Sequence, residues 1–143
     1  MTFRGFATIT FYADDLAAAR DWYTELLGLE PYFAFPEAPA APAYIEFRVG
    51  DDEDELGFVD RKYAPAAATG TPGGAIMNWH VDDVAGTLAT LLAMGATEYE
   101  PLTPRGDSGF VTASVVDPFG NVLGIMHNPH YLEILAARAS SPS

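Results

Sequence analysis

The sequence predicts an α+β fold built from two βαβββ modules. The first observation is an internal repeat, because residues 7–30 and 75–97 each read as an apolar run of strand length, an Asp-Asp pair, a helical stretch and a glycine. The second is that segments 54–60 and 121–127 align at an offset of 67, close to the offset of 68 between the two Asp pairs. Two copies are too few for a solenoid, which stacks three or more repeats. They predict a pseudo-twofold domain whose functional site lies where the copies meet.

The first module is predicted over residues 6–60. Alternating polar and apolar residues predict its first strand, and an aspartate caps the helix that follows, which ends at Gly28. A proline-rich loop at 36–43 and an acidic turn at 51–55 separate the later strands. The predicted strands are 6–13, 30–35, 44–49 and 55–60, and the predicted helix is 15–27.

A linker rich in Pro, Gly and Ala at 61–74 leads to the second module, residues 75–128. Pro101 and Pro104 make its second strand an edge strand, because proline cannot donate to a central ladder. We expect a single domain over residues 1–143. The predicted strands are 76–81, 97–105, 110–117 and 122–127, and the predicted helices are 83–94 and 130–138.

Composition excludes several classes of function. The chain has no cysteine, so disulfides, thiol catalysis and thiolate metal sites are excluded. Twenty acidic residues against 7 basic ones give a net charge of -13, which argues against binding nucleic acid or anionic membranes. That charge is compatible with a cationic ligand, and equally with a role in solubility alone. No run reaches membrane-spanning length and the first residues do not form a signal peptide, so we expect a cytoplasmic protein.

Three features together resemble a known family. They are the two βαβββ units, the DDL and DDV turns into the helices, and the DPFGN turn at 117–121 before the last strand. On these motifs the chain, over residues 6–128, resembles the vicinal oxygen chelate superfamily of glyoxalases, bleomycin-resistance proteins and extradiol dioxygenases. The resemblance implies a curved eight-stranded sheet forming a concave ligand cup, with helices on the convex side. It also implies a homodimer.

The chemistry of that family normally rests on a divalent metal held by His, Glu or Gln, which acts as a Lewis acid. Counting from the helix-opening and turn aspartates, the ligand positions are Thr8, Gly57, Ile76 and Gly124. None of these side chains ligates a catalytic divalent cation, so we expect no metal and no cofactor. The resemblance then points to the metal-free branch, similar to proteins that sequester antibiotics. An enzyme of the same family (lyase, isomerase or dioxygenase) and a regulatory ligand sensor stay open, and no catalytic residue is assigned.

Candidate ligand-binding residues follow from strand parity. Tyr12 and His80 occupy equivalent positions in the two repeats. Three roles are open to them: an acid–base pair, a polar anchor for a ligand, or simple packing. The sequence leaves open whether Glu46 faces the ligand cup or the solvent. The aromatic residues before the proline-rich loop either form a lid over the ligand or belong to the hydrophobic core. The residues predicted to contact a small molecule are Thr8, Thr10, Tyr12, Phe33, Phe35, Glu46, Asn78, His80, Phe110 and Met126.

Overall fold

The computed structural model describes residues 2–65, 72 and 74–140. The chain divides into two compact units, Met1–Thr71 with Phe119–Asn121, and Pro72–Pro118 with Val122–Ser143. We call these units module 1 and module 2. They follow the two predicted repeats, except that the turn at Phe119–Asn121 belongs by its contacts to module 1.

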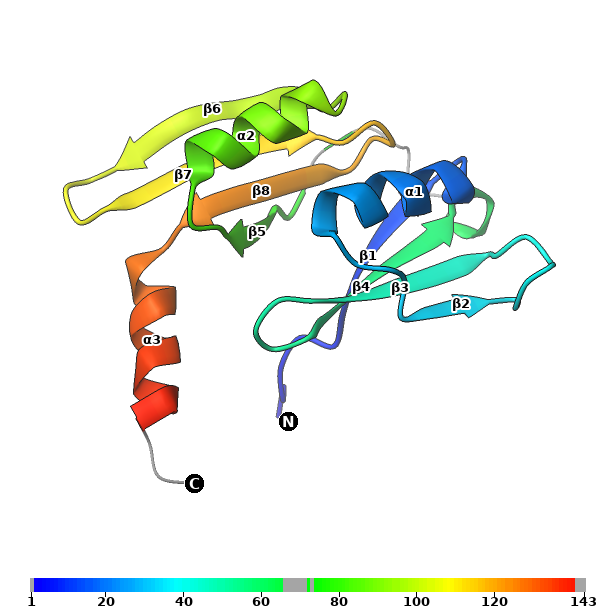
Figure 1. Cartoon of the computed structure of the whole chain (residues 1–143), viewed down its shortest axis with the longest axis horizontal. Coiled ribbons are helices and arrows are strands. Elements are labelled where there is room, and N and C mark those ends of the chain that lie inside the picture. The colour runs from blue at the N-terminus through cyan, green and yellow to red at the C-terminus, as the bar shows by residue number, and fades with distance from the viewer. Residues whose placement is uncertain (1, 66–71, 73, 141–143) are drawn as a thin grey trace. The chain divides into compact units, whose positions relative to one another are not determined.

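Module 1 has the predicted order of elements (Figure 1). Its sheet has the strand order β1-β4-β3-β2, with β1 parallel to β4 and the other pairs antiparallel. The predicted second strand is shorter than expected, and a 3-10 turn, η1, occupies the start of the predicted linker. The elements are β1 (Thr8–Ala13), α1 (Leu16–Leu27), β2 (Phe33–Phe35), β3 (Tyr44–Val49), β4 (Asp54–Asp60) and η1 (Arg61–Tyr63).

Module 2 repeats this topology, with the strand order β5-β8-β7-β6 and a parallel β5–β8 pair. The edge position predicted for β6 is confirmed, and its register with β7 shifts on either side of Glu100, close to Pro101. No helix among the described residues is long and apolar enough to cross a membrane. The elements are β5 (Met77–His80), α2 (Val84–Ala93), β6 (Thr97–Arg105), β7 (Phe110–Val116), β8 (Val122–His127) and α3 (Pro129–Ser140).

The two βαβββ modules predicted from the repeat are therefore confirmed. The strands form two four-stranded sheets, and each sheet pairs strands of one module only. The single eight-stranded cup implied by the family resemblance stays a prediction. Most of the predicted linker, residues 66–71 and 73, lies outside the described residues.

The Asp pairs start both helices in the same way. Asp15 accepts a hydrogen bond from the Ala18 amide (3.0 Å), and Asp83 accepts one from the Gly86 amide (2.9 Å). Each aspartate thereby satisfies an N–H group that has no partner within its helix. Gly28 ends α1 in the left-handed region (φ 67°), as the sequence predicted.

The core of module 1 lies between its sheet and α1. Side chains of one parity on β1, β3 and β4 are buried against the helix, where Tyr23 is almost fully covered. Its ring lies 4.5 Å from that of Phe58. Because side chains alternate along a strand, the residues of the other parity occupy the opposite face of the same sheet. The buried sheet residues are Phe11, Ala13, Ile45, Phe47, Val49, Leu56 and Phe58.

The turn at Phe119–Asn121 closes the free edge of β1. Asn121 Nδ2 donates to the Tyr12 carbonyl (3.0 Å), and Asn121 Oδ1 accepts from the Tyr12 amide (3.3 Å). Arg61 adds a bond to the same carbonyl (3.3 Å) and one to the Phe119 carbonyl (2.7 Å). A side-chain amide thus supplies the donor and acceptor that a neighbouring strand would supply.

Candidate functional site

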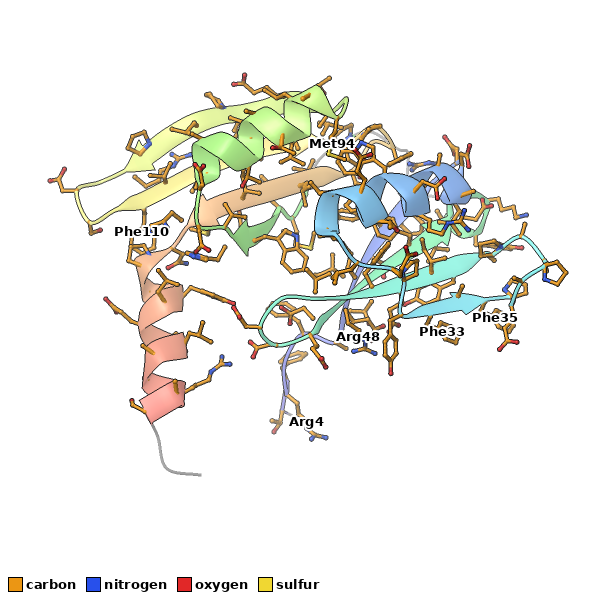
Figure 2. The ribbon with its side chains drawn as sticks, viewed as in Figure 1. Arg4, Phe33, Phe35, Arg48, Met94 and Phe110 are labelled. Atoms are coloured by element: carbon orange, nitrogen blue, oxygen red, sulfur yellow. The ribbon has the colours of Figure 1, made fainter. Side chains whose placement is uncertain are left out.

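The candidate site is the face of the module 1 sheet turned away from α1, which we call the module 1 polar face. Figure 2 shows Phe33, Phe35 and Arg48 on this side of the sheet. Strand register arranges its side chains in three rows across the sheet. These rows are Thr8–Glu55–Arg48, Thr10–Gly57–Glu46–Phe33 and Tyr12–Val59–Tyr44–Phe35.

Two carboxylates form the centre of this face. The Tyr44 hydroxyl lies 3.1 Å from Glu46 Oε1 and 3.3 Å from Glu55 Oε1, and donates to one or the other. On the other side, Arg48 Nη2 lies 2.8 Å from Glu46 Oε2 and 3.2 Å from Glu55 Oε2. Thr8 Oγ1 donates to Glu55 Oε1 (2.7 Å). Glu46 is buried, and a buried carboxylate is tolerated only when it is paired and hydrogen-bonded in this way.

The network sets the protonation of two of its members. The hydrogen bond from Thr8 holds the pKa of Glu55 below its ordinary value, and the charge of Arg48 acts in the same direction. Burial, followed by the neighbouring carboxylates, raises the pKa of Tyr44 far above its ordinary value of 10.0. At neutral pH the phenol is therefore neutral and Glu55 is ionised.

The raised pKa of Tyr44 predicts a loss of stability in alkali. Below pH 10 the phenol is protonated in both the folded and the unfolded chain. Above pH 10 the unfolded chain releases this proton while the folded one retains it, so the free energy of unfolding falls as pH rises. In Tyr44→Phe we expect a shallower fall between pH 10 and 11.5, measured by urea unfolding at each pH. Equal slopes in the two proteins would contradict the assignment.

Exposed aromatic rings border the carboxylates. Tyr32, Phe33 and Phe35 are exposed, and Phe33 stands directly opposite Glu46 in the β2–β3 register. The Phe33 ring lies 6.2 Å from that of Tyr44, at the normal separation of a tilted aromatic pair. The Arg48 guanidinium lies 5.1 Å from the centre of the Tyr32 ring, within the range of a cation–π contact.

The corresponding face of module 2 carries mainly neutral polar groups, with an ion pair between Glu100 and Arg105 (3.5 Å) toward its edge strand. Its rows are Asn78–Gly124–Ser114–Glu100 and His80–Met126–Thr112–Thr103, with Phe110 opposite Arg105 at the end of β7. Ser114 occupies the repeat position of Glu46, since both lie opposite the glycine of the last strand. Its hydroxyl is buried and has no hydrogen-bond partner among the described residues.

His80 is packed into the start of α3. Its Nδ1 accepts the amide of Asn128 (3.0 Å), so the neutral ring carries its proton on Nε2. Tyr131 stacks on the imidazole at 4.8 Å, and Nε2 lies 3.6 Å from a carboxylate oxygen of Asp82. Of the roles open to His80, these contacts favour packing, and its contact with a ligand stays a prediction.

The residues at the family's metal-ligand positions do not fit a divalent metal. Thr8 uses its hydroxyl on Glu55, and the glycines have no side chain to offer. The space that a side chain would need is also taken: a Cβ on Gly57 would lie 2.8 Å from the Tyr44 ring, and one on Gly124 would overlap the Asn78 amide. Among the described residues no group of three or more His, Asp or Glu side chains has the arrangement of a metal site.

Strand register brings several of the predicted residues together. Thr8, Thr10, Glu46 and Phe33 share one neighbourhood on module 1. Tyr12 and Phe35 lie in the adjacent row, and Asn78, His80, Met126 and Phe110 belong to the face of module 2. Sequence reasoning missed Tyr44, Arg48 and Glu55. The segment YIEFRV contained the signal for two of them, because Ile, Phe and Val alternate strictly with Tyr, Glu and Arg.

A family model now decides the classification. The model of the Glyoxalase/Bleomycin resistance protein/Dioxygenase superfamily matches residues 5–125. The chain belongs to this superfamily. No curated protein sequence matches it significantly. The family resemblance seen in the repeat is thereby confirmed.

Solved structures of the superfamily share the fold. A glyoxalase-related enzyme from Fulvimarina pelagi is 25% identical with a TM-score of 0.69, over 89% of this chain and 90% of that one. Lactoylglutathione lyase from Agrobacterium tumefaciens is 20% identical with a TM-score of 0.65, over 91% and 98%. An antibiotic binding protein from a Streptomyces species is 22% identical with a TM-score of 0.64, over 89% and 98%. The superfamily fold thus occurs both in a lyase and in a protein that binds an antibiotic.

Proposed function

We propose that this superfamily member binds a small cationic aromatic molecule on the module 1 polar face, without a metal ion. The observation that carries the proposal is Glu46, a buried carboxylate on the open face of a sheet, directly beside the exposed ring of Phe33. Small-molecule sites typically combine apolar and aromatic walls with a few fixed polar groups. Here the polar groups are held by their own network, so the site is ordered before a ligand arrives.

The charge of the face supports a cationic ligand. Glu46 and Glu55 contribute two negative charges, Arg48 contributes one positive charge, and Tyr44 is neutral. The face therefore keeps one net negative charge beside aromatic rings that favour cations. The overall charge of -13 adds a long-range attraction for the same class of ligand.

The proposal is tested with three aromatic compounds of matched size, one cationic, one neutral and one anionic. Calorimetric titration should rank their affinities cation, neutral, anion, and added salt should weaken the cation most. EDTA should leave the affinity unchanged, and mass spectrometry should recover the ligand intact. Tighter binding of the anion or loss of binding in EDTA would overturn the proposal. Conversion of the ligand would instead favour the lyase, isomerase or dioxygenase alternative.

We further propose that the protein acts as a homodimer in the cytoplasm. The support is the family resemblance for the dimer and the sequence composition for the compartment. Sedimentation equilibrium over a hundredfold range of concentration tests the dimer, and a purely monomeric species at every concentration would contradict it.

A further inference from the structure

The cation site of the module 1 polar face already holds a cation of its own. Arg48 Nη2 bridges one oxygen of Glu46 and one of Glu55, which lie on neighbouring strands. The guanidinium also lies 5.1 Å from the centre of the Tyr32 ring. A planar cation held between two carboxylates and an aromatic ring is the arrangement expected of a bound ligand, and here a side chain provides it.

Access to the carboxylates runs through Arg48. The side chain of Glu46 is 9% exposed and that of Glu55 is 21% exposed, whereas that of Arg48 is 37% exposed. Each Glu46 oxygen already lies beside a donor: Arg48 at Oε2, and at Oε1 the Tyr44 hydroxyl, which also lies beside Glu55. An incoming cation therefore reaches Glu46 by replacing the guanidinium, which is the most exposed of the three charged groups.

The hydrogen-bonding groups of Arg48 are also not all paired in the structure. Its Nε is buried and has no hydrogen-bond partner among the described residues, and a buried donor without a partner costs free energy. Moving the side chain into water restores hydration to that N–H. This gain offsets part of the cost of breaking the contacts with Glu46 and Glu55, so replacement by another cation is less costly than for a fully bonded arginine.

We propose that Arg48 is a resident counter-ion, which a planar amidinium or guanidinium group of the ligand replaces on Glu46 and Glu55. The inference rests on the proposed function and adds the chemical class of the cationic group. A planar cation reproduces both the carboxylate contacts and the stacking on Tyr32, and it is more weakly hydrated than an ammonium. A benzamidinium is therefore expected to bind more tightly than a benzylammonium of similar size.

The test follows the arginine Nε–H signals of the wild-type protein by ¹⁵N NMR during titration with benzamidinium. The chain has 6 arginines, since Lys62 is the only lysine among 7 basic residues, so the spectrum is small. The Arg48 signal is assigned from its loss in Arg48→Met. We expect it to shift and to exchange faster with water as benzamidinium binds. The signal of Arg61, which is held by Asp14 (3.1 Å) and the Phe119 carbonyl, should not change.

Affinities of the variants provide the second measurement. Arg48→Met should bind benzamidinium at least tenfold more tightly than the wild type, because the probe no longer competes with a tethered cation. Arg20→Met is the matched control, since Arg20 is a partly exposed residue of α1 paired with Asp21, and the affinity of this variant should equal that of the wild type. The NMR titration itself is carried out on the wild-type protein, and Arg48→Met serves there only to assign the Arg48 signal.

Two results would overturn the inference and leave the proposed function standing. One is binding of benzamidinium with an unchanged Arg48 signal; the other is equal or weaker binding in Arg48→Met. Tighter binding of benzylammonium than of benzamidinium would overturn the planar class. If neither aromatic cation binds the wild type or Arg48→Met, the proposed function fails together with the inference.

Discussion

Glu46→Gln should lower the affinity for a cationic aromatic ligand by about tenfold to a hundredfold. The substitution preserves the shape of the side chain but removes its charge, and a hydrogen bond to a charged group contributes about 1.5–3 kcal/mol. Affinity for a neutral aromatic ligand of the same size should change much less. Calorimetric titration of both ligands against both proteins separates the two effects.

The control for this prediction is Glu25→Gln, which makes the same change in net charge on the exposed surface of α1. It should leave the affinity near that of the wild type, because exposed charges are screened within about 10 Å at 0.1 M salt. If Glu25→Gln weakened binding as much as Glu46→Gln, the effect would be that of overall charge and not of the polar face. Circular dichroism should show unchanged secondary structure in both variants.

Gly57→Ala should destabilise module 1 by about 1–3 kcal/mol, the usual cost of overpacking. The added Cβ would lie 2.8 Å from the ring and hydroxyl of Tyr44. The ring must move, and the hydroxyl then loses its contacts with Glu46 and Glu55. Urea unfolding measures the stability, and the same variant should bind a cationic ligand more weakly because its carboxylates are no longer held in place.

The double variant Gly57→Ala/Tyr44→Ala provides the control. With the ring removed, the alanine methyl at residue 57 has space, so Gly57→Ala should cost less in this background than in the wild type. Residues in direct contact typically show coupling of 0.5–3 kcal/mol in such cycles. Additive effects would mean that Tyr44 does not fill the space over Gly57, and the argument against a metal ligand at this position would weaken with it.

Local sequence patterns predict much of the fold. The two Asp-capped helices, the alternating strands and the repeat offset are all local or pairwise features of the chain, and the structure confirms them. Prolines at 101 and 104 correctly indicated an edge strand. Bounds differ by a few residues, as at β2, where the Tyr32 amide bonds the Glu46 carbonyl just outside the strand.

The polar face was only partly predictable, because its network depends on register between strands far apart in the chain. Alternation alone places Thr8 and Thr10 on one face. That Glu55 lies beside Thr8, and that Tyr44 covers Gly57, follows from the β1–β4 and β3–β4 registers. The packing of His80 against Tyr131 depends on the path of the chain after β8, on which strand parity has no bearing.

The contact between Asn121 and Tyr12 has a consequence for whether the two repeats can be separated. Asn121 belongs to the second repeat by sequence, yet its amide satisfies the backbone of the first strand of the first repeat. The first half expressed alone would expose that strand edge, and such edges promote self-association. One turn of the second repeat thus protects the edge strand of the first, so the first repeat depends on the second for cover of its own sheet.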